Sequence, residues 1–321
     1  MGFVISHKKN EERRAILPED VAKLKNKSSL VFEAGYGNVY GIDDSAYTNA
    51  GASIASREDV FKCEIIVDVK LGDADYIDKL DKGKILVGWA HATQQVDFTS
   101  AILQGDHTVI AWEDIYENGW HVFYRNNEIA GEAAVMHAFR YSKKMPYDTK
   151  VCILGNGQTA KGCLRILHCL GADVDVYPRK HEDLFKKRMF EYDVVINCVM
   201  WDTSRTDRII YKSDLQKFKR GTLIIDVSCD PHLEIETSRP TSVKDPVYEV
   251  DGVIHYAVDH TPTLFAATAT KVLSDVFSKY IDEIIDDSYT PSINAATVIR
   301  KGHIISDGIR SFREKRGLFV K

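Results

Sequence analysis

Short apolar runs constrain this chain most, because they recur along it with room for a helix between neighbours. Each run has the length of a buried strand. They are Phe3–Ile5, Leu30–Phe32, Ile65–Val67, Ile85–Val87, Val109–Ala111, Lys150–Leu154, Ala172–Val176, Asp193–Asn197 and Thr222–Asp226. Strands that alternate with helices form parallel sheets. The sequence therefore predicts an α/β fold with two Rossmann-like domains, one of them a doubly wound parallel sheet that binds a cofactor.

Helical patterns complete this organisation. A mixed face over Glu132–Lys144, ended by Pro146, predicts one helix. Apolar pairs recur every three to four residues from Val272 to Ile285 and predict an amphipathic helix of about four turns. A last helix is expected over Ala295–Ile309. We expect this helical tail to return to the first domain, so that residues 1–128 and 266–321 form a substrate domain and residues 129–265 a cofactor domain, with an interdomain cleft.

Composition excludes several classes of protein. The 321 residues suggest about two domains, and the net charge of −5 without a long Lys or Arg run argues against a nucleic-acid partner. No apolar run approaches the roughly 18 residues of a membrane span. The six cysteines form no C-x-x-C pair, and the histidines show no metal-site spacing. We therefore expect a cytoplasmic protein with reduced cysteines and no metal. A homo-oligomer is a separate expectation, which composition does not decide.

The segment after the strand Lys150–Leu154 matches the dinucleotide-binding pattern G-x-G-x-x-A. Gly155 suits the tight turn, Gly157 lets the backbone approach a pyrophosphate, and Ala160 keeps the following helix close to the sheet. The amides at the helix start, which include those of Gln158 and Thr159, then face the phosphates. A plain strand-to-helix glycine turn is the alternative reading.

The end of the next strand indicates which dinucleotide binds. NAD sites usually carry an acid there, but Tyr177 and Pro178 follow Val176, and Asp175 lies within the strand. Arg179 and Lys180 instead offer two positive charges suited to the 2′-phosphate of NADP(H), although a solvated basic turn would look the same. We also assign Cys198 and Val199, which follow the strand Asp193–Asn197, to the cofactor site.

Several local patterns resemble, in order, those of the alanine dehydrogenase and saccharopine dehydrogenase group. The most specific pair is Asp226–Asp230 with Glu236–Thr241, similar to V-D-V-x-x-D and E-x-S-R-P-T. The others are Glu11–Pro18, Glu33–Gly37, Tyr47–Ala52, Asp68–Lys70, Gly88–Ala92, Ala111–Glu113 and Glu128–Gly131. Together they cover nearly the whole chain.

Within this group the chain most resembles the N(5)-(carboxyethyl)ornithine synthases. Alanine dehydrogenases continue Lys-Glu-Pro where this chain has Lys70-Leu71-Gly72, and Val-Ala-Asn-Met-Pro where it has Val258–Pro262. The resemblance implies NADPH-dependent condensation of pyruvate with the side-chain amine of ornithine or lysine. Alanine dehydrogenase and saccharopine dehydrogenase are alternatives. So is the nucleotide-binding portion of a transhydrogenase, which would not need Arg13, Lys70 and His91 together.

The resemblance also assigns the chemistry. Arg13 is the arginine that grips the substrate carboxylate, and Lys70 contacts a carboxylate or the carbinolamine oxygen. His91 takes a proton from the amine and returns it to the leaving hydroxyl, and Asp230 orients the amine or the nicotinamide ribose. Taken alone, each has a structural reading: a surface arginine, a lysine at a strand end, a packed histidine. His260 is a further candidate by its position near the motif.

Overall fold

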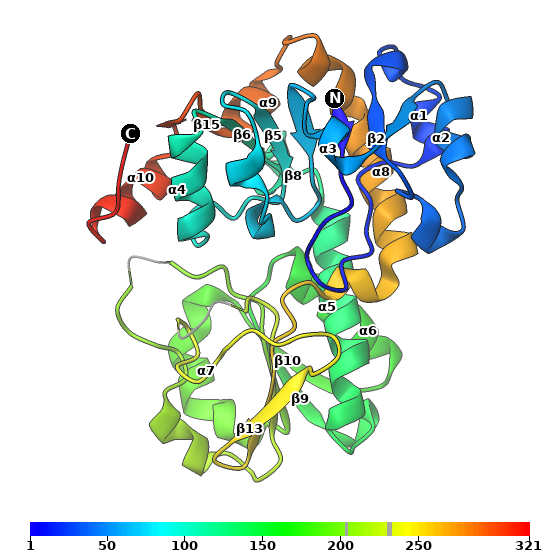
Figure 1. Cartoon of the computed structure of the whole chain (residues 1–321). Helices are drawn as coiled ribbons and strands as arrows, with labels where there is room; N and C mark the ends of the chain where they lie inside the picture. Colours follow the sequence, from blue (N-terminus) through cyan, green and yellow to red (C-terminus); the bar gives the residue numbers. More distant parts are fainter. Residues whose placement is uncertain (203–204, 230–232) are drawn as a thin grey trace. The chain divides into compact units, whose positions relative to one another are not determined.

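The computed structural model describes residues 1–202, 205–229 and 233–321 (Figure 1). Contacts divide the chain into two compact units. The first unit comprises Met1–Phe123 and Ala266–Lys321, and the second unit comprises Tyr124–Phe265. The sequence placed the first boundary after residue 128. The break in contacts lies earlier, because the helix that opens the second unit already begins at Tyr124.

The first unit is built on an eight-stranded sheet of order β16-β15-β6-β5-β4-β1-β2-β3. From β3 to β6 the strands are parallel, and β15 joins β6 antiparallel. The chain leaves β1 toward β2 and β3 and then crosses to β4 on the other side. The bounds are β1 Gly2–Phe3, β2 Val31–Glu33, β3 Ser53–Ala55, β4 Ile65–Val67, β5 Ile85–Gly88, β6 Thr108–Ala111, β15 Thr297–Arg300 and β16 His303–Ile304.

Helix α8, Ala266–Ile285, packs into the core of the first unit and confirms the predicted amphipathic segment. Its buried Leu273 and Phe277 share a cluster with the rings of Phe3, Phe32 and Trp112. The remaining elements of this unit are α1 Pro18–Val21, α2 Asp44–Asn49, α3 Arg57–Val60, α4 Val96–Gln104, α9 Pro291–Ala296, α10 Asp307–Glu314 and the hairpin β7 Tyr116–Glu117 with β8 Trp120–His121.

The predicted helix over Ala295–Ile309 is wrong. Helix α9 ends at Ala296, and the chain continues as the strands β15 and β16 before α10 begins. The β-branched, buried Val298 and Ile299 extend the sheet beside β6. Lys301 and Gly302 make the turn between the strands with φ of 47° and 74°. That left-handed backbone cannot continue a helix.

The second unit has a six-stranded sheet of order β10-β9-β11-β12-β14-β13, parallel except for β13. Its direction of growth reverses between β9 and β11, as in a doubly wound sheet. The predicted fold class is confirmed. The bounds are β9 Lys150–Leu154, β10 Asp173–Tyr177, β11 Val194–Asn197, β12 Leu223–Asp226, β13 Val247–Val250, β14 Val253–Tyr256, α5 Tyr124–Ala138, α6 Gln158–Cys169 and α7 Glu182–Arg188.

Two features of this unit differ from the sequence prediction. Helix α5 covers Tyr124–Ala138 rather than Glu132–Lys144. It begins earlier than predicted because polar residues of its first turns are buried, which hides the amphipathic pattern. It ends earlier because the chain continues as a 3₁₀ turn after Ala138. The hairpin of β13 and β14 was missed, although its turn carries the Asp251-Gly252 signal, with φ of 50° and 83°.

Glycines bring α5 and α6 together, and Figure 1 shows the two helices side by side. A Cβ on Gly131 would lie 2.1 Å from the carbonyl oxygen of Thr159. One on Gly162 would lie 2.0 Å from that of Glu128. Neither distance is compatible with a side chain, so these glycines set how closely the two helices pack. Ala160, as predicted, is buried in the core between α6 and the sheet.

Candidate functional site

In the first unit, the predicted substrate residues all follow the carboxyl ends of parallel strands. Arg13 comes after β1, Lys70 after β4 and His91 after β5. The sheet's growth reverses between β1 and β4, and ligands of such sheets bind beyond the carboxyl ends at this point. Glu113, which follows β6, lies on the same edge and was not assigned a role from the sequence.

Arg13 is buried and not a surface arginine, with 3% of its surface exposed. Its Nε donates to Glu11 Oε1 at 2.8 Å and its Nη2 to Glu11 Oε2 at 2.6 Å. The backbone amide of Arg13 binds the same carboxylate at 2.9 Å. Glu11 therefore fixes the plane of the guanidinium and covers its Nε edge. Neighbouring Arg14 is structural, because its Nε donates to the carbonyl oxygen of Tyr36 at 2.5 Å.

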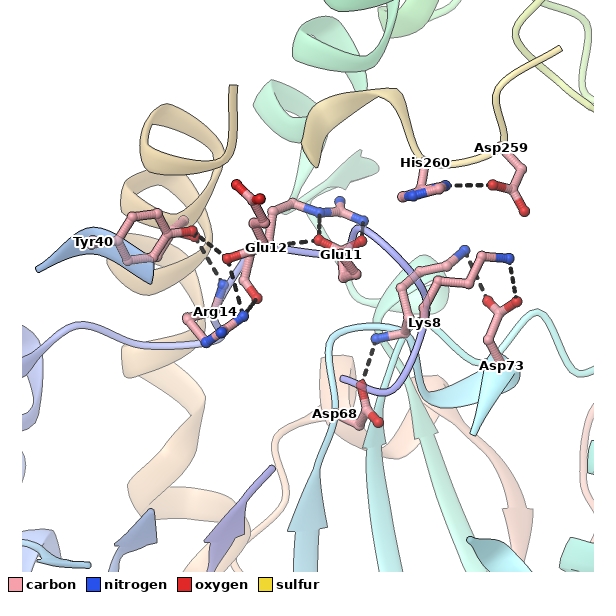
Figure 2. Close-up of polar contacts among 12 residues, drawn as sticks. Lys8, Glu11, Glu12, Arg14, Tyr40, Asp68, Asp73, Asp259 and His260 are labelled. Atoms are coloured by element: carbon pink, nitrogen blue, oxygen red, sulfur yellow. Dashed lines mark hydrogen bonds and ion pairs between the residues drawn. The ribbon is translucent and has the colours of Figure 1, made fainter. Parts of the chain in front are cut away.

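Lys70 is held by two carboxylates that sequence reasoning left out. Its buried ammonium lies 3.1 Å from Asp73 Oδ2, and its backbone amide donates to the fully buried Asp68 at 2.9 Å. Lys8 reaches the other oxygen of Asp73 at 2.7 Å (Figure 2). Burial of Asp73 opposes its ionisation, but the two ammonium groups outweigh this and lower the pKa of its carboxyl. The ammonium groups of Lys70 and Lys8 thus share the carboxylate of Asp73.

His91 is exposed and has a left-handed backbone, with φ of 43°. Its amide donates to Glu113 Oε1 at 2.5 Å, and the amide of Ala90 donates to Oε2 at 3.1 Å. The His91 ring is nearly parallel to that of Trp89, with centroids 6.3 Å apart. Burial raises the pKa of Glu113, against the effect of the two amides and of Lys70. Glu113 therefore holds the strained turn that presents the His91 ring.

The glycine loop of the second unit has the geometry that its motif predicts. Gly155 follows β9 with φ of 111°, and a Cβ there would lie 2.7 Å from the carbonyl oxygen of Cys198. Gly157 precedes the first residue of α6, and a Cβ there would meet no atom within 4 Å. The loop thus needs glycine at 155 for the turn, and at 157 it leaves open space beside the start of a helix.

Cys198 and Val199 follow β11 and so flank the point where this sheet reverses. Gln158 and Thr159 open α6 and are partly exposed. A helix start whose amides face open space suits a pyrophosphate. These residues therefore fit a dinucleotide, whose phosphates they would hold while it supplies or accepts a hydride.

Residues 178–181, which directly follow β10, provide no acid for an adenosine ribose. Tyr177 ends the strand and is buried, and Asp175 accepts a hydrogen bond from the Tyr192 hydroxyl at 2.6 Å. Arg179 and Lys180 lie on an exposed 3₁₀ turn. The Arg179 guanidinium is 3.6 Å from Asp202, a loose contact between two exposed groups. The basic pair is accessible.

Asp230 lies outside the described residues. His260, which the sequence marked only by position, is 4% exposed and pairs with Asp259. Within the described part of the chain, no group of three or more metal-ligating side chains is found. None of the helices described there is long and apolar enough to cross a membrane.

Comparison with known proteins places these residues in a family. The N-terminal domain model of "Alanine dehydrogenase/PNT" matches residues 4–130, and its C-terminal domain model matches residues 177–311. The N(5)-(carboxyethyl)ornithine synthase of Clostridium botulinum is 31% identical over 298 residues, which cover 88% of this chain and 93% of the relative. Alanine dehydrogenase 1 of Staphylococcus aureus is 24% identical over 350 residues, 95% of this chain and 94% of the relative.

Among solved structures, an L-alanine dehydrogenase superposes with a TM-score of 0.82 at 21% identity, covering 98% of this chain and 99% of that one. At that identity the likeness shows the fold alone. The glycine loop falls between the two matched segments, so its assignment rests on its own geometry. The two matched segments together span most of the sequence, and the chain belongs to the alanine dehydrogenase/PNT family.

Proposed function

We propose that this protein is an NADPH-dependent oxidoreductase that condenses pyruvate with the side-chain amine of ornithine or lysine and reduces the resulting imine. The observation that carries the proposal is the 31% identity to a carboxyethylornithine synthase, in a match that covers 93% of that relative's length. The exposed Arg179 and Lys180, with no acid at the end of β10, support NADPH over NADH. The product would be an N-(1-carboxyethyl) amino acid.

The side chains of the first unit suit the 2-oxo acid. Glu11 fixes the plane of the buried Arg13 guanidinium, and a planar guanidinium is suited to grip a substrate carboxylate as a bidentate pair. Lys70 would stabilise the negative charge that develops on the oxygen of the carbonyl and carbinolamine. Its ammonium is buried, and a buried cation stabilises such charge more than one in water does. Asp73, 3.1 Å from the Lys70 ammonium, holds that group in place.

His91 would move the protons of imine formation. Its ring is exposed on a turn that Glu113 fixes, and an imidazole can both accept a proton and return it. By the family pattern, Asp230 would orient the amine or the nicotinamide ribose. We also propose that the chain works as a homo-oligomer, which light scattering after gel filtration would test.

The experiment follows oxidation of NADPH and NADH with one 2-oxo acid and one amine at a time. Pyruvate and 2-oxoglutarate would each be combined with ornithine, lysine and ammonia. Turnover with pyruvate and a diamino acid, faster with NADPH, is the expected result. Activity with ammonia alone would identify an alanine dehydrogenase instead, and 2-oxoglutarate with lysine a saccharopine dehydrogenase. No turnover with any pair would favour the transhydrogenase-type nucleotide-binding role.

A further inference from the structure

Buried His260 and half-buried Asp259 form a dyad between β14 and the turn Thr261–Phe265. The Nδ1 atom of His260 lies 2.5 Å from Asp259 Oδ1, a contact drawn in Figure 2. Only 2% of the His260 side chain is exposed, against 25% for Asp259. On the other side of the ring, Nε2 is fully buried and has no hydrogen-bond partner among the described residues.

This arrangement fixes which atom of the ring is available. A carboxylate at Nδ1 accepts the Nδ1 proton, so in the neutral ring Nε2 has a lone pair and acts as an acceptor. Buried polar atoms are almost always hydrogen-bonded in native proteins. His255, in the same unit, follows this rule: its Nε2 meets the Thr237 hydroxyl at 2.8 Å and its Nδ1 the Val253 carbonyl at 3.2 Å. The unpartnered Nε2 of His260 therefore calls for a donor from a ligand.

The backbone holds the dyad in position. The Thr261 hydroxyl donates to the carbonyl oxygen of Ala130 on α5 at 2.9 Å, and the amide of Thr263 donates to the His260 carbonyl at 3.1 Å. Thr261, Pro262 and Thr263 are all buried. The ring is thus part of a packed turn rather than a mobile loop, which preorganises Nε2 for one ligand atom.

We propose that His260 Nε2 binds the primary ammonium of the amine substrate and takes its proton, with Asp259 as the positioning residue. This inference rests on the proposed function. One N–H bond of the ammonium breaks, its electron pair stays on nitrogen, and the proton forms an Nε2–H bond. Asp259 balances the imidazolium charge. The nitrogen pair then forms the C–N bond with the carbonyl carbon, and the carbonyl electron pair moves to oxygen.

The dyad serves one proton transfer of imine formation. The reaction removes protons from nitrogen and adds them to the oxygen that leaves as water. His260 takes the first of these protons from the ammonium. An alkyl amine is almost wholly in its ammonium form at neutral pH. It needs such a base to remove a proton before its nitrogen can attack. The nicotinamide carboxamide is another N–H donor that could meet Nε2, so the test must separate the amine from the cofactor.

The experiment measures binding apart from turnover. Isothermal titration gives the affinity of NADP⁺, and then that of ornithine and of lysine for the protein–NADP⁺ complex. Four proteins are compared: the unmodified chain, His260→Asn, Asp259→Asn and the control His255→Gln, which replaces a buried histidine that has both ring nitrogens bonded. We expect His260→Asn to weaken amine binding at least tenfold and Asp259→Asn about threefold. NADP⁺ affinity should stay within twofold in all four.

Turnover supplies the second readout. With pyruvate and NADPH saturating, His260→Asn should lower kcat/KM for the amine about 100-fold, the scale of a lost general base, and KM for pyruvate should not change. Equal loss of NADP⁺ affinity would assign Nε2 to the cofactor and overturn the inference. So would amine affinity within twofold of the unmodified chain, or no amine binding to the unmodified chain. If His260→Asn does not fold, Asp259→Asn and His260→Gln decide by the same criteria. Amine binding that depends on His260 without turnover would sink the proposed function alone.

Discussion

The two units share a strand arrangement but use its carboxyl edge differently. In both sheets the chain first adds strands on one side of the first strand, β1 or β9. It then crosses to the other side of that strand, to β4 or β11. After β9, a glycine turn leads directly into α6, and the edge is lined by backbone amides and open space. After β1, residues 4–17 form a loop of charged side chains, several of them buried.

In both units the strand order sets the place of this edge, and the loops set which chemical groups line it. Backbone amides at a helix start recognise phosphate and need no side chain. A 2-oxo acid instead needs cations, and buried cations must be compensated. The first unit compensates them within its own edge, through Glu11 for Arg13 and Asp73 for Lys70 and Lys8.

The strongest test of the first unit's edge is Lys70→Met. We expect kcat/KM for pyruvate to fall about 10³-fold, because an ammonium at developing negative charge is worth several kcal/mol in a site of low dielectric. The melting temperature should change little, since Asp73 remains paired with Lys8 at 2.7 Å. The matched control is Lys8→Met, for which we expect a loss of tenfold or less. Steady-state kinetics in which both variants lose equally would refute the special role of Lys70.

Acid should act on the second unit through His255. Burial lowers the pKa of this imidazole from its ordinary 6.5 to about 4. The unfolded chain therefore takes up a proton first, and the free energy of unfolding falls as the pH drops from about 6.5 toward 4. The full effect is about 3 kcal/mol at 1.36 kcal/mol per pKa unit. Denaturant titrations across this range should show a shallower fall for His255→Gln; parallel curves would contradict the assignment.

Two glycine substitutions should separate turn geometry from cofactor contact in the second unit. Gly157→Val adds a side chain into open space, so the fold should persist while the Kd for NADPH rises about 100-fold. Gly155→Ala forces a Cβ against the Cys198 carbonyl at φ of 111° and should cost about 1–3 kcal/mol of stability. Thermal melts and fluorescence titration measure both. A Gly157→Val protein that binds NADPH normally would remove the loop from the site.

The smallest effect concerns the choice of dinucleotide. Replacing Arg179 and Lys180 with glutamine should reduce the preference for NADPH over NADH about tenfold, since exposed cations bind a 2′-phosphate through partly screened charge. The ratio of the two kcat/KM values measures this. The Asp175→Asn control should leave the ratio unchanged, because Asp175 is engaged by Tyr192. An unchanged ratio in the double variant would mean that Arg179 and Lys180 belong to a solvated basic turn and do not contact the cofactor.

The sequence predicted the strands well because each central strand is buried on both faces, which leaves an apolar run that local reading detects. It failed at Ala295–Ile309, where the pairing of Val298 and Ile299 with β6 overrides the local pattern. Sequence reasoning assigned no role to Glu113 and Asp73, because the groups that a carboxylate contacts depend on which segments the fold brings together. Asp73 was nonetheless three residues from a predicted site lysine, a spacing that could have marked it.

By itself, the sequence determined the α/β class, the glycine loop and the residue types after each strand, since strand burial and tight turns are local properties. Only the tertiary structure decided how those residues are paired. It showed Arg13 braced by Glu11 and Lys70 sharing a carboxylate with Lys8. It also showed the ring of His260 buried, with Nε2 bonded to none of the residues that the structure describes. Such pairings depend on which loops meet at a sheet edge, and desolvation gives them their strength.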